Sequence, residues 1–84
     1  FSSEYLIAFS VLSLDLKAED FAVTVLRECI KVFPYEINAY ILYGNILANH
    51  GKYEEANAIW RSGLVVSPGN EQLKQNLAKI KAHL

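Results

Sequence analysis

The sequence predicts an all-α protein, a solenoid of antiparallel helix pairs with five helices. Three observations predict this class. Apolar residues recur at spacings of three and four through most of the chain, which is the period of amphipathic helices. The two prolines, Pro34 and Pro68, stand 34 residues apart, and each follows such a segment. The only strand-like stretch, GLVVS at 63–67, is too short and too isolated to build a sheet.

The first two helices are expected at 4–15 and at roughly 18–33. The earlier helix is apolar around nearly its whole circumference, which is typical of a helix that is buried on most sides. The connection DLKA between the two helices contains no glycine, so its turn is less clearly marked than the later ones.

The third and fourth helices are expected on either side of Gly51. This glycine ends the third helix as a left-handed C-terminal residue. Glu54 and Glu55 fall in the first turn of the fourth helix, where carboxylates suit the positive end of the helix dipole, and Pro68 stops that helix. The buried face of the third helix is expected to carry Ala39, Tyr40, Tyr43, Ile46 and Leu47.

The fifth helix is expected over 71–84. Asn70 precedes it and is a favoured capping residue, because its side chain accepts a hydrogen bond from a free backbone amide of the first turn. Tyr35 and Tyr53 stand near helix starts and are expected to cover the ends of helix pairs. The apolar stripe of the fifth helix is Leu73, Leu77, Ile80 and Leu84.

A repeat underlies this arrangement, since residues 3–36 align with residues 37–70. Small, large and helix-breaking positions agree between the two segments, and a period of about 34 residues is known for paired helices. The identical pairs are Ile7 with Ile41, Ala22 with Ala56, Arg27 with Arg61, Val32 with Val66 and Pro34 with Pro68.

These residues resemble the tetratricopeptide repeat (TPR) family. Its pattern places an aromatic residue, a large-small pair and a further large residue in one helix, then an alanine and an aromatic residue in the next, then a proline. The second repeat, about 37–70, matches with Tyr40, Tyr43, Gly44, Leu47, Ala56, Trp60, Gly63 and Pro68. The first repeat, about 3–36, is a degenerate match, and residues 71–84 look like the family's capping helix. The resemblance implies one TPR-like domain over 1–84, expected to be a fragment of a longer chain.

Gly44 stands inside a helix, where glycine costs roughly 0.5–1 kcal/mol relative to alanine. We expect a close helix crossing as the compensation, with Gly44 facing Ala56 of the following helix. Ser10 and Ala22 would occupy the equivalent places in the first repeat.

No group of residues in the sequence predicts catalysis, a cofactor or a metal. His50 and His83 are expected to be solvated residues of a turn and of the C-terminus, and Cys29 a buried structural thiol. Phosphate-binding, nucleophile-elbow and zinc-protease motifs are absent from the sequence. We therefore expect that the chain is not an enzyme.

Charge and hydropathy exclude further classes. The net charge is −1 and the basic residues are scattered, whereas nucleic-acid binding needs a clustered basic face. The longest apolar run, residues 5–14, is shorter than the roughly 17–25 residues of a membrane span. The single cysteine fits a reducing compartment, and a cytoplasmic location is expected.

The resemblance implies a protein-interaction module or scaffold. Its concave face, formed by the first helix of each repeat, would bind a peptide, a partner protein or a neighbouring domain. Lys79 is the only cation expected there, so acidic C-terminal tails are disfavoured as ligands. Asn45 could form a hydrogen bond to a ligand backbone, or Asn45 and Asn49 could simply be solvated. By repeat register this groove is lined by Ile7, Val11, Asn38, Ile41, Asn45, Asn49, Gln72, Asn76 and Lys79.

Two other functions are compatible with the sequence. The apolar first helix could be covered by a preceding repeat or segment of a longer chain, could associate with a second copy to form a homo-oligomer, or could receive the functional partner. The chain could also be an accessory helical domain of a larger enzyme. A helix-turn-helix DNA-binding protein is disfavoured because the sequence lacks a basic recognition helix. The residues expected to carry self-association are Tyr5, Leu6, Ile7, Val11 and Leu14.

Overall fold

The computed structural model describes residue 7 and residues 19–84, and every regular element within them is helical. The all-α class predicted from the sequence is confirmed for this part of the chain. The α-helices are α2 (Glu19–Val32), α3 (Ile37–Asn49), α4 (Tyr53–Val66) and α5 (Glu71–Ile80), followed by the 3-10 turn η1 (Lys81–His83).

The described part therefore contains four of the five helices expected. Ile7 is helical, but the rest of the helix expected at 4–15 lies outside the described residues. The last helix is shorter than the predicted 71–84, because α5 ends at Ile80 and the chain tightens into η1. Leu84 consequently leaves the apolar stripe and is 57% exposed.

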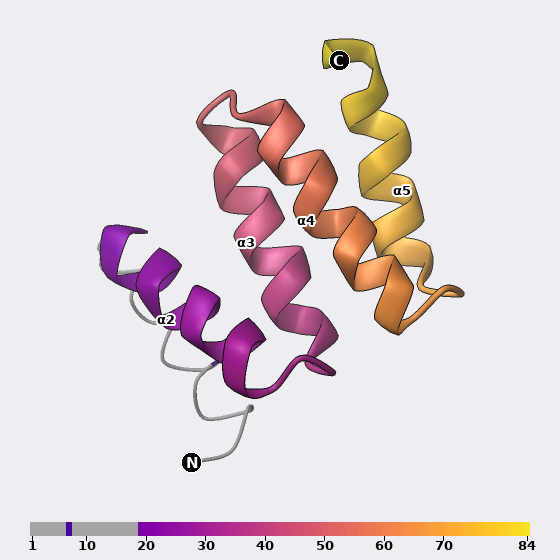
Figure 1. Cartoon of the computed structure of the whole chain (residues 1–84). Coiled ribbons are helices and arrows are strands. Elements are labelled where there is room, and N and C mark those ends of the chain that lie inside the picture. Colours follow the sequence, from indigo (N-terminus) through magenta and orange to yellow (C-terminus); the bar gives the residue numbers. More distant parts are fainter. Residues whose placement is uncertain (1–6, 8–18) are drawn as a thin grey trace.

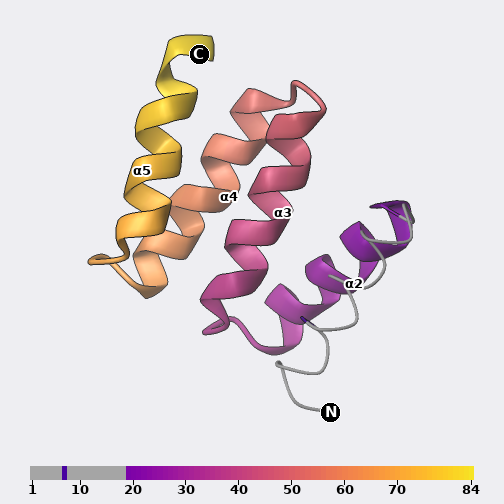
Figure 2. The ribbon, with the colours of Figure 1, turned by 180° about the vertical axis from the view of Figure 1, so that it is seen from behind.

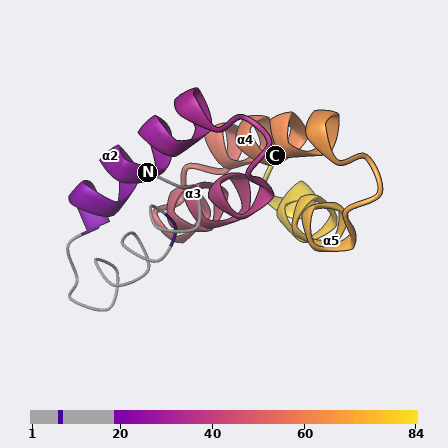
Figure 3. The ribbon, with the colours of Figure 1, turned by 90° about the horizontal axis from the view of Figure 1, so that it is seen from below.

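The helices lie side by side in chain order, each packed against the next (Figures 1 and 2). Seen from below, they form two layers, with α2 and α4 in one and α3 and α5 in the other (Figure 3). Short connections of this kind place sequential helices antiparallel to each other. The layer of α3 and α5 is the one that the repeat register predicted to line a groove.

The turn between α3 and α4 is set by Gly51, whose φ of 75° lies in the left-handed region. Its N–H donates to the Ala48 carbonyl at 3.0 Å, and the Lys52 N–H donates to the Leu47 carbonyl at 2.9 Å. This pair of bonds is the Schellman arrangement, which satisfies the last free carbonyls of a helix. The helix end predicted at Gly51 is confirmed.

The start of α5 is capped as the sequence predicted. Asn70 has an extended backbone, and its Oδ1 accepts a hydrogen bond from the Leu73 N–H at 2.9 Å. The bond satisfies one of the backbone donors that a helix start leaves free. Because Leu73 is fully buried, the cap also fixes where α5 enters the core.

Gly44 allows α3 to lie directly against α4. A Cβ added to Gly44 would lie 2.1 Å from Nε1 of Trp60 and 2.5 Å from both Cδ1 and Cε2. The close crossing is confirmed. The nearest atoms belong to Trp60, one turn beyond Ala56, because residues four apart share one helix face.

Burial and one hydrogen bond hold Trp60 in this position. Its ring is only 4% exposed, and its Nε1 donates to the Ile41 carbonyl of α3 at 3.4 Å. Gly63, one turn further on, is a second close contact, because an added Cβ would lie 2.9 Å from Leu73 Cδ1 and 3.0 Å from Tyr40 Cβ. Glycine at these two positions lets α4 pack tightly against both α3 and α5.

The core consists of two clusters that meet at Tyr43. Tyr43 is partly buried and packs against both clusters. Ala22, buried as predicted, belongs to the first cluster, while Ser10 lies outside the described residues. The first cluster contains Ala22, Leu26, Cys29, Ala39 and Ile46, and the second contains Leu47, Ala56, Trp60, Leu73 and Ile80.

The two tyrosines expected to cover helix ends differ in the structure. Tyr53 is half-buried against the second cluster, in agreement with that expectation. Tyr35 is 83% exposed, so the prediction for it was wrong. The chain turns at Pro34 and Tyr35 between α2 and α3, and a side chain at such a turn projects into solvent.

Candidate functional site

A cavity of 250 Å³ lies between α3 and α5, beside the start of α4; we call it the α3–α5 cavity. Its lining residues recur at spacings of three and four along α3 and from α5 into η1, so each helix presents one face to it. No acidic side chain lines it. The lining residues are Asn45, Ala48, Tyr53, Trp60, Asn76, Lys79, Ile80 and His83.

Asn76 is the buried polar residue of this cavity. Its side chain is 8% exposed, and its Oδ1 accepts a hydrogen bond from Nε2 of Gln72 at 3.0 Å. Its Nδ2 is buried and has no hydrogen-bond partner in the described part of the chain. An unsatisfied buried donor typically costs about 1–3 kcal/mol of folding stability. The unpartnered Nδ2 of Asn76 therefore destabilises the folded chain.

Tyr53 and His83 form one side of the cavity by stacking on each other. Their ring centroids are 4.2 Å apart and the rings are inclined by 12°. His83 was expected only as a solvated C-terminal residue, and its contact with Tyr53 was not predicted. Residue numbering along a continuous helix could not have revealed it, because the 3-10 turn η1 redirects the chain after Ile80.

Three residues of the predicted groove come together at this cavity: Asn45, Asn76 and Lys79. Gln72 is next to them through its bond to Asn76. Asn38 and Asn49 are exposed and do not line the cavity.

The other predicted groove residues lie elsewhere. Ile41 is half-buried against the second core cluster, and Ile7 packs against the first. Val11 lies outside the described residues. The same holds for Tyr5, Leu6 and Leu14 of the predicted self-association surface.

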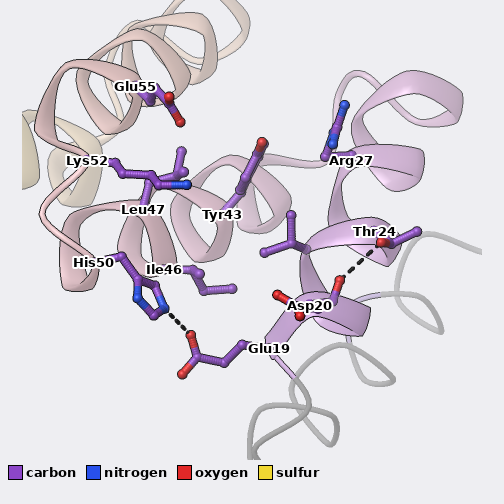
Figure 4. Close-up of a pocket in the computed structure, with 11 residues that line it drawn as sticks. Glu19, Asp20, Thr24, Arg27, Tyr43, Ile46, Leu47, His50, Lys52 and Glu55 are labelled. Atoms are coloured by element: carbon purple, nitrogen blue, oxygen red, sulfur yellow. Dashed lines mark hydrogen bonds and ion pairs between the residues drawn. The ribbon is translucent and has the colours of Figure 1, made fainter.

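A larger, charged cavity of 660 Å³ lies between α2 and the α3–α4 hairpin (Figure 4). Nε2 of His50 and Oε2 of Glu19 lie 2.5 Å apart at its edge, and both side chains are about half exposed. Exposed pairs of this kind contribute about 0.2–1 kcal/mol. Glu19 stands in the first turn of α2, and its contact with His50 was not predicted from the sequence.

Among the residues that the structure describes, Cys29 and Tyr40 have a clearly shifted pKa. Burial raises the pKa of the Cys29 thiol, and the Glu36 carboxylate adds to this effect. Burial also raises the pKa of Tyr40, with the charge of Cys29 as the smaller cause. The Tyr40 hydroxyl donates to the Pro34 carbonyl at 2.8 Å. Both groups serve packing between α2 and α3, and the burial predicted for Cys29 is confirmed.

The described residues contain no cluster of three or more histidine, cysteine or acidic side chains that could hold a metal ion. Among the same residues, no helix has both the length and the apolar character that crossing a membrane requires.

The helix pairs and the inter-helix cavity define a helical-repeat protein. No protein-family model matches the chain. A relative from Mycosarcoma maydis, described as small glutamine-rich tetratricopeptide repeat-containing protein 2, is 35% identical over 65 residues, which is 77% of this chain. The resemblance to the tetratricopeptide repeat family is confirmed by this relative. The chain spans only 18% of that relative's length.

Proposed function

We propose that this chain is a non-enzymatic protein-interaction module that binds an extended peptide segment on the layer of α3 and α5. The observation that carries the proposal is the gathering of Asn45, Asn76 and Lys79 around one cavity between these two helices. The segment can belong to a partner protein or to a neighbouring domain of the same protein. The helical-repeat family supports a binding role, because stacked helix pairs offer an extended face.

The chemistry of the cavity supports binding rather than catalysis. Its polar groups are the amides of Asn45 and Asn76, the Lys79 ammonium, and the polar atoms of the Tyr53, Trp60 and His83 rings, and the rest of its lining is aliphatic. Binding sites typically combine apolar walls with a few placed polar groups that orient the ligand. Asn45 is half-buried in α3 and Lys79 is exposed on α5, so both can contact a bound segment without disturbing the core.

The proposal is tested with a displayed library of random peptides selected on the immobilised 84-residue chain. Asn45→Ala and Lys79→Ala are expected to weaken the selected peptides, whereas the control Lys74→Ala is expected to bind normally. Lys74 is exposed on the same helix and does not line the cavity. Selection of no peptide, or equal binding by all variants, would contradict the proposal.

Ile41→Glu is a poorer test of the same groove, although the sequence analysis placed Ile41 there. Its side chain packs against the second core cluster. A buried carboxylate at this position would destabilise the fold, so loss of binding by this variant would not identify a contact.

A further inference from the structure

The α3–α5 cavity contains a hydrogen-bond donor that the described protein does not use. Nδ2 of Asn76 is buried and unpartnered, while Oδ1 of the same side chain is bonded to Gln72. In this arrangement Oδ1 faces the Gln72 NH2 group, and rotation of the Asn76 amide alone would bring two donors together and break this bond. A ligand that brings an acceptor would remove the deficit.

We infer that this cavity binds an uncharged carbonyl oxygen of an extended, low-charge peptide segment, with Nδ2 of Asn76 as the donor. The inference rests on the proposed function and names the chemistry that the binding face recognises. Gln72 acts as a positioning residue, because its bond to Oδ1 holds the donor in place.

A neutral acceptor fits this site better than a carboxylate. Asn76 is 8% exposed, and the only permanent positive charge in the lining belongs to Lys79, which is exposed. A carboxylate beside Asn76 would lose its hydration without gaining a buried counter-charge, which is unfavourable. A carbonyl has far less hydration to lose, and Asn45 offers it a second amide from α3.

The walls favour an apolar side chain next to the bound carbonyl. Tyr53 and His83 stack into one continuous surface, and Ile80 is buried beside them. Aromatic and aliphatic walls of this kind bind apolar groups in water. The expected ligand is therefore an extended segment in which an apolar residue flanks the carbonyl that reaches Asn76.

The first test uses small probes of each chemistry and the side-chain amide signals of Asn76 in NMR spectra of the 15N-labelled 84-residue chain. N-acetyl-leucine N′-methylamide represents a main-chain carbonyl, acetamide an asparagine or glutamine side chain, and acetate a carboxylate. We expect saturable shifts of the Asn76 signals with the methylamide at millimolar concentrations. Stronger binding of acetamide would assign the carbonyl to a side chain. Tighter binding of acetate at equal ionic strength, or no response to either amide, would overturn the inference.

The second test uses variants and the peptides selected on the chain. Asn76→Asp keeps an acceptor for Gln72 but removes the donor, and it is expected to weaken binding about tenfold or more. The control is Asn57→Asp, a half-buried residue of α4 that lines a different cavity.

Asn76→Leu separates binding from folding. It removes the unpartnered amide, so its unfolding temperature is expected to equal or exceed that of the unchanged chain, while binding is lost. A purely structural role for Asn76 would lower the unfolding temperature and leave affinity unchanged. Peptides that bind all Asn76 variants equally would overturn this inference and leave the proposed function standing. A chain that binds neither peptides nor probes would overturn both.

Discussion

The backbone of Gly44 in α3 lies against the indole ring of Trp60 in α4, so closely that an added Cβ would fall 2.1 Å from Nε1. The ring cannot retreat, because it is almost completely buried and its Nε1 is bonded to the Ile41 carbonyl. The glycine is therefore required by the neighbouring helix and not by its own backbone conformation. This contact explains why a helix interior retains a residue that weakens it.

Gly44→Ala is expected to destabilise the fold by about 1–2 kcal/mol. Alanine would normally strengthen a helix by roughly 0.5–1 kcal/mol, and overpacking against Trp60 typically costs about 1–3 kcal/mol. The loss is measured by urea unfolding followed by circular dichroism. Gly69→Ala is the matched control, since a Cβ there meets nothing within 4 Å. A Gly44→Ala protein as stable as the unchanged chain would contradict the close contact.

Gly51→Ala is expected to cost about 1–2 kcal/mol for a different reason. A Cβ at Gly51 meets no atom within 4 Å, but its φ of 75° is strained for other residues. Asparagine tolerates this conformation better than alanine, so Gly51→Asn should lose less. Equal unfolding midpoints for the alanine and asparagine variants would argue against backbone strain as the cause.

Asn70→Ala is expected to destabilise the chain by about 1 kcal/mol, because the Leu73 N–H would lose its acceptor. Asn70→Asp retains an acceptor and adds a negative charge at the helix start, so it should be close to neutral or stabilising. Thermal unfolding of both variants measures the difference. A larger loss for aspartate than for alanine would show that the cap does not act through this hydrogen bond.

Cys29 is expected to resist alkylation in the folded chain. The thiol is fully buried, and its raised pKa leaves less of the reactive thiolate at a given pH than an unfolded chain would have. Mass spectrometry after treatment with iodoacetamide at mildly alkaline pH should show slow modification of the native chain and rapid modification in urea. The onset of reaction should also lie at higher pH for the folded chain. Similar rates in both states would contradict this burial.

Local signals made much of this fold predictable. Helical spacing located α2, α3 and α4, and Gly51 and Asn70 marked helix ends through short-range geometry that depends on only a few neighbouring residues. The end of α5 was missed because Leu84 continued the apolar spacing after the helix had stopped. Apolar periodicity records which face can be buried, not where the helix ends.

Contacts between distant residues were less predictable. The pattern showed that Gly44 faces the following helix, but it did not show that the atoms nearest to Gly44 belong to the Trp60 ring. The contact of His50 with Glu19 joins residues 31 positions apart, and no local spacing encodes it. The unpartnered donor of Asn76 was also invisible, because it depends on which groups are missing around it.

Tyr43 is the one residue among those described that packs against both core clusters. Both clusters also include residues of α3, so the Tyr43 ring adds a side-chain contact to the coupling that this shared helix already provides. In helical-repeat proteins, such nearest-neighbour terms decide whether units melt together or one after another. Truncation of Tyr43 is therefore expected to divide a single cooperative unfolding transition into two. The packing of α4 and α5 should then persist after the contact between α2 and α3 is lost.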